Sequence, residues 1–123
     1  MRRRFIAVFV VGALWGGVAG LDAAPTQTDG QATFAQCAAC HSTDGSNGLG
    51  PTLKGIFGRA SAAVPGFSYS NAMKRTHWNW TAEELDKYIA DPQGAVPGNT
   101  MPYAGMADSA QRAALIAYLE TLK

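Results

Sequence analysis

The sequence predicts an all-α domain with long ordered loops. Two segments, residues 81–91 and 108–123, carry helix-capping residues followed by apolar side chains at helical spacing. No segment alternates apolar and polar residues convincingly in the manner of a half-buried strand. Fourteen glycines and six prolines among 123 residues indicate that much of the remaining backbone forms turns and loops.

The first residues are typical of a bacterial export signal. Three arginines precede an apolar run that ends near Val18 and is accompanied by small residues. We expect a cleavable signal peptide over residues 1–20, with cleavage between Ala19 and Ala24. The apolar run is shorter than the roughly 20 residues of a membrane span, which argues against an uncleaved anchor. The mature chain is therefore expected in the periplasm, without stable membrane insertion.

The mature domain carries almost no net charge. Removal of residues 1–23 takes away three of the ten basic and one of the nine acidic residues, which leaves seven and eight and a net charge of −1. No basic stripe remains, which argues against nucleic acid as a partner. We predict a linker over residues 21–28 and a single domain over residues 29–123 that is a monomer.

The first helix is expected to begin with Asp29 as its N-cap and to end soon after His41. A second begins at Thr81, where Glu84 completes a capping-box pattern, and stops at Pro92. The last has Asp108 as its N-cap and is expected to pack on the first helix through an apolar stripe. Its stripe consists of Leu115, Tyr118, Leu119 and Leu122.

The segment between the last two helices, "PQGAVPGNTMPYAG", is predicted to be a shaped loop and not a helix. Its prolines fix the backbone φ angle, and its glycines permit tight turns.

Both cysteines of the chain lie in the pentapeptide "CAACH". On a helix, Cys37, Cys40 and His41 project toward one side, because positions i, i+3 and i+4 share a face. This pattern is the attachment signature of c-type haem, in which two thiols bond to the porphyrin and the imidazole reaches the iron. The motif therefore predicts one haem c, covalently attached through Cys37 and Cys40.

Three other uses of the two thiols are less well supported. A structural zinc site needs four ligands, but the only histidine besides His41 is His77. A thioredoxin-like redox pair belongs to a βαβ context, which this chain lacks. A plain disulfide is compatible with an oxidising compartment. However, a small glycine-rich domain has little apolar mass of its own, and a haem would supply the missing core.

From Gly30 to Lys123 the sequence resembles the class I monohaem cytochromes c of mitochondria and bacterial periplasms. The resemblance rests on "CAACH", "GPTLKGIFGR", "PGFSYS", "VPGNTMPYAG" and "LIAYL", which occur in the family's order and near its spacing. It implies the cytochrome c fold, in which the N- and C-terminal helices cross while short helices and ordered loops wrap around the haem. It also implies that Gly30 and Phe34 face the last helix at this crossing.

The resemblance assigns the second iron ligand to Met101, with Met73 and Met106 as the rival methionines. It implies that the carbonyl of Pro51 accepts a proton from His41, which would fix the imidazole tautomer. Tyr88, Asn99 and Tyr103 would lie near the methionine sulfur, the haem edge and a propionate. The residues implied to face the haem propionates are Arg59, Tyr69 and Trp80, whereas Trp78 and His77 are expected at the surface.

A His/Met-ligated haem implies a periplasmic electron carrier with redox-protein partners, and no enzyme activity. The alternatives are a haem peroxidase or ligand-binding sensor with a labile sixth ligand, and a haem subunit fixed in a larger oxidoreductase. One departure from the mitochondrial members concerns the lysines that surround their haem edge. The matching positions here are Gln36, Gln93, Gly94 and Thr100. We therefore expect a partner contact that is more apolar and less sensitive to salt.

Overall fold

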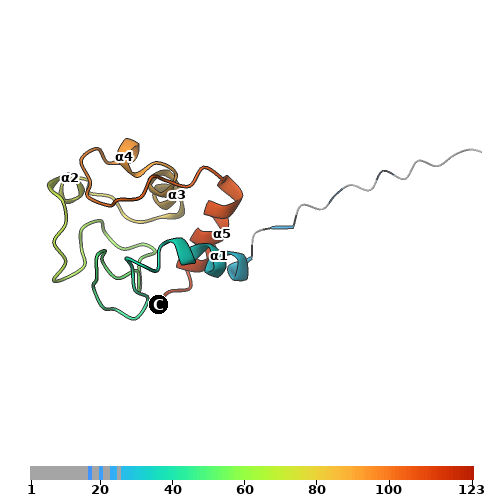
Figure 1. The fold of residues 1–123 in the computed structure, drawn as a ribbon, viewed down its shortest axis with the longest axis horizontal. Helices are drawn as coiled ribbons and strands as arrows, with labels where there is room; N and C mark the ends of the chain where they lie inside the picture. Colours follow the sequence, from blue (N-terminus) through green and yellow to red (C-terminus); the bar gives the residue numbers. More distant parts are fainter. Residues whose placement is uncertain (1–16, 18–19, 21–22, 25) are drawn as a thin grey trace, which may run out of the picture.

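Figure 1 shows the computed structural model of the chain, which describes residues 17, 20, 23–24 and 26–123. Most of the predicted signal peptide lies outside these residues, as do residues 21, 22 and 25 of the predicted linker. The elements are α1 (Gln27–Thr33), the 3₁₀-helix η1 (Phe34–Gln36), α2 (Asn71–Lys74), α3 (Ala82–Ala90), α4 (Pro92–Ala95) and α5 (Ser109–Leu119). Extended pairing in the described part is limited to an isolated antiparallel bridge between Ala60 and Asn79. The all-α prediction is confirmed.

Helix α1 begins earlier than predicted. Its N-cap is Thr26, whose hydroxyl accepts a hydrogen bond from the Asp29 N–H at 3.2 Å, while the Asp29 carboxylate accepts one from the Thr26 N–H at 3.2 Å. The prediction of Asp29 as the N-cap is therefore wrong. Asp29 is the third helical residue, and together the two side chains satisfy two N–H groups at the helix start. Hydrogen bonds from Thr26 also lower the pKa of Asp29.

The prediction that the first α-helix continues to His41 is also wrong. After Thr33 the chain tightens into η1 and then into turns over residues 37–40. The Cys37 N–H donates to the Phe34 carbonyl at 2.8 Å, three residues back instead of four. The His41 N–H still donates to the Cys37 carbonyl at 3.0 Å, so one helical turn joins these two residues. Because this turn is present, Cys37, Cys40 and His41 still project toward the same side.

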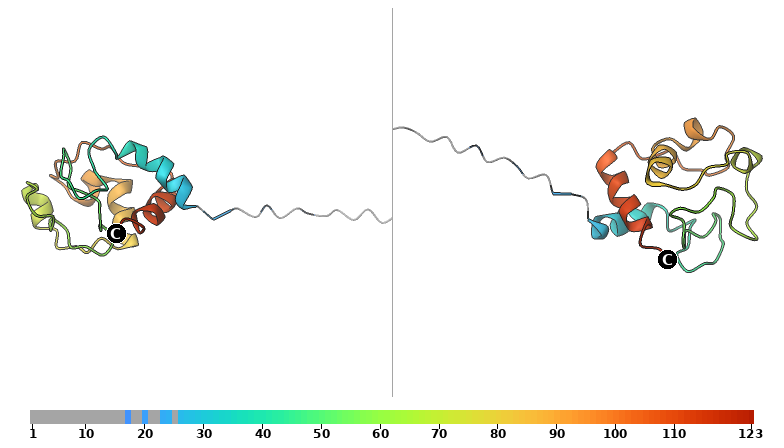
Figure 2. Two further views of the ribbon diagram at one scale, coloured as in Figure 1. Left: turned by 90° about the horizontal axis from the view of Figure 1, so that it is seen from below. Right: turned by 180° about the vertical axis from the view of Figure 1, so that it is seen from behind.

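Helices α1 and α5 cross in direct contact, as both views in Figure 2 show. Gly30 of α1 is buried, and a Cβ built on it would overlap the Ala114 carbonyl oxygen and lie 2.7 Å from the Tyr118 Cβ. The rings of Phe34 and Tyr118 lie 5.4 Å apart beside this contact. The predicted packing of the last helix on the first is confirmed, and it depends on a glycine at the crossing.

The second predicted helix is α3, capped by the Thr81 hydroxyl, which accepts from the Glu84 N–H at 3.3 Å. The following loop is not continuous, because α4 forms one turn directly after it. Asp91 caps α4 by accepting from the Gly94 N–H at 3.0 Å, and Pro92 occupies the first turn. The prediction of a loop without a helix is wrong here, since a capping Asp followed by Pro is a helix start.

The buried core lies where α3 and α5 meet the loops that follow η1 and α4 (Figure 1). Among the described residues, no helix combines the length and the apolar character needed to cross a bilayer. The buried cluster comprises Phe34, Ile56, Met73, Trp80, Leu85, Tyr88, Val96, Met106, Leu115, Ile116 and Leu119.

Replacement of Gly30 tests the helix crossing. We expect Gly30→Ala to destabilise the haem-loaded protein by about 1–3 kcal/mol, because the added methyl group forces α1 and α5 apart. The measurement is denaturant unfolding of the purified protein. Gly48→Ala is the matched control, since its Cβ would meet its nearest neighbour, the Cys40 carbonyl oxygen, at an ordinary 3.6 Å. Equal stability of the two variants would contradict the proposed close contact.

Candidate cofactor-binding site

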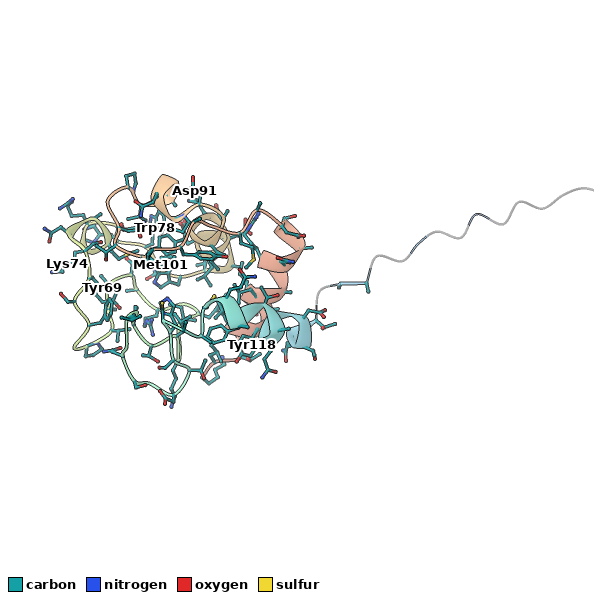
Figure 3. The ribbon with its side chains drawn as sticks, in the orientation of Figure 1. Tyr69, Lys74, Trp78, Asp91, Met101 and Tyr118 are labelled. Atoms are coloured by element: carbon teal, nitrogen blue, oxygen red, sulfur yellow. The ribbon has the colours of Figure 1, made fainter. Side chains whose placement is uncertain are left out.

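A cavity of about 480 Å³ lies inside the shell of helices and loops. Cys37, Cys40 and His41 line it from the turns after η1, and Met101 lines it from the loop between α4 and α5. Figure 3 shows Met101 on that loop, in the interior of the view. His41 and Met101 are 60 residues apart in the sequence, and the fold brings them to one cavity. All ten residues proposed for the cofactor line it, namely Cys37, Cys40, His41, Pro51, Arg59, Tyr69, Trp80, Tyr88, Asn99 and Met101.

The His41 ring is held by the loop residues Gly50 and Pro51. Its Nδ1 lies 2.7 Å from the Pro51 carbonyl oxygen, the contact that the sequence resemblance implied. A carbonyl only accepts, so Nδ1 carries the proton and Nε2 keeps a free lone pair. A Cβ on Gly50 would lie 2.5 Å from the His41 Cε1, so only glycine permits this ring position. This contact leaves Nε2 as the ring nitrogen available to bind a metal.

The two cysteines do not form a disulfide, and both are half-buried. Burial raises the pKa of Cys37, and the neighbouring Cys40 raises it further. The thiolate form is thus disfavoured at neutral pH, whereas reactive redox cysteines have a lowered pKa. The environment therefore argues against a thioredoxin-like use of this pair.

The three candidate methionines differ in position. Met101 is half-buried and lines the cavity, and Met73 of α2 lines it from the buried core. Met106 is 4% exposed and packs in the core without lining the cavity. The arrangement removes Met106 as a rival and leaves Met73 as the other methionine at the cavity.

Arg59 supplies a buried donor that lacks an acceptor. Its two terminal nitrogens donate to the carbonyl oxygens of Lys54 and Thr52, each at 3.0 Å. Its Nε is buried with no hydrogen-bond partner in the described part of the chain. Of the residues that the structure describes, Arg59 is the one Lys or Arg that lines the cavity, and burial lowers its pKa. A carboxylate of the cofactor would satisfy Nε, so this side chain fits a haem with acidic substituents.

Three aromatic residues form part of the cavity wall. The Tyr69 hydroxyl accepts from the Val64 N–H at 3.2 Å, and its own proton remains available to a cofactor carboxylate. The rings of Trp80 and Tyr88 lie 5.2 Å apart, both buried, and burial raises the pKa of Tyr88 to about 12. Trp78 does not line the cavity; its ring packs edge-on against that of Trp80, and the Lys87 ammonium lies 5.1 Å from its centroid.

Asn99 lines the cavity, as the resemblance implied, but its amide group is bonded to the protein backbone. Its amide nitrogen donates to the Pro92 and Val96 carbonyls, and its amide oxygen accepts from the Met101 N–H. Both amide protons are used by the loop backbone. The side chain therefore has no donor left for a propionate or a sulfur atom.

Several cavity residues were not identified from the sequence. Leu53, Ile56 and Leu85 supply apolar wall, and a helical or loop pattern alone does not distinguish them from ordinary core. Tyr103 donates its hydroxyl proton to Gln36 Oε1 at 3.1 Å, which links the two sides of the cavity opening. This contact joins residues 67 positions apart, so no local signal predicts it.

The comparisons with known proteins agree with this site. The family model for cytochrome c matches residues 27–123. Cytochrome c2 of Blastochloris viridis is 39% identical over 122 residues, covering 98% of this chain and 93% of that protein. Cytochrome c-type cyt cy of Rhodobacter capsulatus is 52% identical over 86 residues, covering 70% of this chain and 43% of that protein. The solved structure of cytochrome cH from Methylobacterium extorquens has a TM-score of 0.74 and 38% identity, covering 78% of this chain and 98% of that chain.

An all-α shell around an apolar cavity, with a C-x-x-C-H motif on its wall, defines a c-type cytochrome. The chain belongs to the cytochrome c family, as a class I monohaem member. It carries one haem c, attached covalently through Cys37 and Cys40.

Proposed function

We propose that this cytochrome is a one-electron carrier in which the His41 imidazole and the Met101 thioether would hold the haem iron. The observation that supports this most strongly is that both side chains line the cavity into which the two attachment cysteines face. The haem supplies a centre that alternates between ferric and ferrous states. With both side chains bound, the iron would have no open position, and the thioether would favour the ferrous state. Closed iron suits electron transfer and not oxygen or peroxide chemistry.

The protein residues prepare the two ligands. The Pro51 carbonyl orients His41 and increases the basicity of Nε2. The loop after α4 presents Met101, and the apolar wall excludes water from it. Arg59 Nε, the Tyr69 hydroxyl and the Trp80 indole are the donors that we assign to the haem propionates, because buried carboxylates need hydrogen bonds.

We assign the mature protein to the periplasm, with redox proteins as its donor and acceptor. The uncharged rim of the cavity supports a specific kind of contact. We define this rim as the uncharged lining residues Gln36, Leu49, Thr100, Pro102 and Tyr103, which are exposed or half-buried. Arg59 also lines the cavity and is half-buried, but its terminal nitrogens are bound to the Lys54 and Thr52 carbonyls. Without charges at the rim, electrostatic steering contributes little to partner association.

Replacement of Met101 tests the ligand assignment. We expect Met101→Ala to retain the covalent haem but to lower the midpoint potential, on the order of 0.1 V within the roughly 0.8 V range that axial ligands set. The ferric protein should bind added imidazole far more tightly, because the sixth position opens. Potentiometric titration and imidazole titration measure the two effects.

Two methionine variants serve as controls for this test. Met106→Leu lies away from the cavity and Met73→Leu lies on its wall, and both should leave the potential near that of the unmodified protein. A high-spin resting ferric haem in the unmodified protein would favour the peroxidase or sensor alternative. An unchanged potential in Met101→Ala, with a large shift in Met73→Leu, would move the ligand to Met73.

Electron self-exchange tests the uncharged rim without needing a known partner. We expect the exchange rate between oxidised and reduced copies to change less than about threefold from 0.01 M to 0.15 M ionic strength, although the Debye length falls from about 30 Å to about 8 Å. The double variant Gln36→Lys with Thr100→Lys should exchange slowly at low salt and recover at high salt. Magnetic-resonance line widths of mixed redox states give the rates. A strong salt dependence of the unmodified protein would contradict the proposal.

A further inference from the structure

We propose that Asn99 is a positioning residue that holds Met101 in its ligand position by fixing the backbone of the loop to α4. The inference rests on the proposed function, because it takes Met101 to be the iron ligand. It assigns to Asn99 a role through the protein chain and not through contact with the haem.

Three hydrogen bonds of one buried side chain carry this inference. The Asn99 Nδ2 donates to the Pro92 carbonyl at 2.8 Å and to the Val96 carbonyl at 2.9 Å. The Asn99 Oδ1 accepts from the Met101 N–H at 2.9 Å. Asn99 is only 7% exposed, so water competes poorly for these bonds. The side chain thus connects both ends of α4 directly to the backbone of the proposed ligand.

The backbone of Asn99 is fixed as well. Its N–H donates to the Val96 carbonyl at 3.1 Å, and its carbonyl accepts from the Gln93 Nε2 at 3.0 Å. Gly98 has a φ of +88°, which turns the chain back over α4 at this point. Residue 99 is therefore tied to α4 through its side chain and through both of its backbone groups.

A methionine sulfur is a neutral ligand, so its binding depends on how well the chain presents it. Met101 can leave the iron only if its loop moves. Such a movement breaks the hydrogen bond between the Met101 N–H and Asn99 Oδ1, or it separates Asn99 Nδ2 from the Pro92 and Val96 carbonyls. Each of these groups would then lose a partner in a mostly buried place, which is unfavourable. The bonds consequently favour the closed state, as preorganisation of a binding group does.

The test uses imidazole as a competing ligand of the ferric, haem-loaded protein. We expect Asn99→Ala to bind imidazole at least about tenfold more tightly, equivalent to about 1.4 kcal/mol. The absorption band that arises from sulfur-to-iron charge transfer should weaken in parallel. Asn99→Asp has nearly the same size and keeps an acceptor for Met101, but it places oxygen against the Pro92 and Val96 carbonyls. We expect a similar increase in imidazole affinity for Asn99→Asp, which would exclude the smaller side-chain volume of Asn99→Ala as the cause.

Two surface variants keep the test decisive if the buried ones mature poorly. Gln93 is an exposed residue, and Gln93→Ala removes only its hydrogen bond to the Asn99 carbonyl. We expect this variant to raise imidazole affinity by about two- to fivefold. Asn79→Ala is the matched control, because Asn79 is exposed and its side chain has no hydrogen bond within the described residues. It should leave affinity and spectrum unchanged.

The outcomes separate this inference from the ligand proposal. If Met101→Ala opens the iron while Asn99→Ala, Asn99→Asp and Gln93→Ala keep the affinity and band of the unmodified protein, the positioning role is refuted and the ligand stands. If Met101→Ala itself changes neither, both are refuted. Lower global stability of the Asn99 variants without a change in imidazole affinity also refutes the positioning role, because it shows a merely structural residue.

Discussion

The structure depends on the covalent attachment of one large apolar body to a single short segment. Cys37 and Cys40 anchor it within one turn of chain, beside His41, and the cavity of about 480 Å³ is bounded by residues from nearly every other part of the domain. Trp80, Leu85, Leu115 and Leu119 line it as well as packing in the core. The burial of these side chains therefore depends on the cofactor that fills the cavity. Arg59 Nε likewise depends on the cofactor for a hydrogen-bond acceptor. In a domain of this size that is rich in loops, the haem supplies the apolar core that a larger protein builds from its own side chains.

Two structural units hold this arrangement from opposite sides. The crossing of α1 and α5 at Gly30 fixes the segment that leads into the attachment motif. The short helix α4, capped by Asp91, fixes the loop that carries Met101 through Asn99. The Tyr103 to Gln36 hydrogen bond joins the two units at the cavity opening. Rigid positioning from both sides limits rearrangement on electron transfer, because neither proposed ligand needs to move.

The fold class and the attachment motif were predictable from sequence signals with clear physical causes, whereas the other proposed cofactor residues followed from the family resemblance. The spacing of Cys37, Cys40 and His41 places the three side chains on one face of a helical turn. The caps at Thr81 and Asp108 satisfy helix N–H groups that would otherwise lack partners. Errors arose where competing local interactions had similar strength. Thr26 and Asp29 both offer a capping oxygen, and only the three-dimensional arrangement shows that they act together.

The role of Asn99 was beyond sequence reasoning for a different reason. The resemblance implied that Asn99 lies near the cofactor. Its amide group donates to the carbonyls of Pro92 and Val96, at the two ends of α4. The prolines and glycines of this segment favoured the prediction of a loop where α4 forms. A side chain that lines a cavity can still direct its polar atoms into the wall. The distinction requires coordinates, since it depends on which way the amide points.

The central claim is that both thiols are consumed in attaching one haem to this chain. An alkaline pyridine haemochrome spectrum of the exported protein tests it most directly, because the position of its bands reports how many vinyl groups have become thioethers. We expect the signature of two thioethers and one haem per chain. A spectrum without that signature, or haem that is extracted by acidified organic solvent, would contradict it.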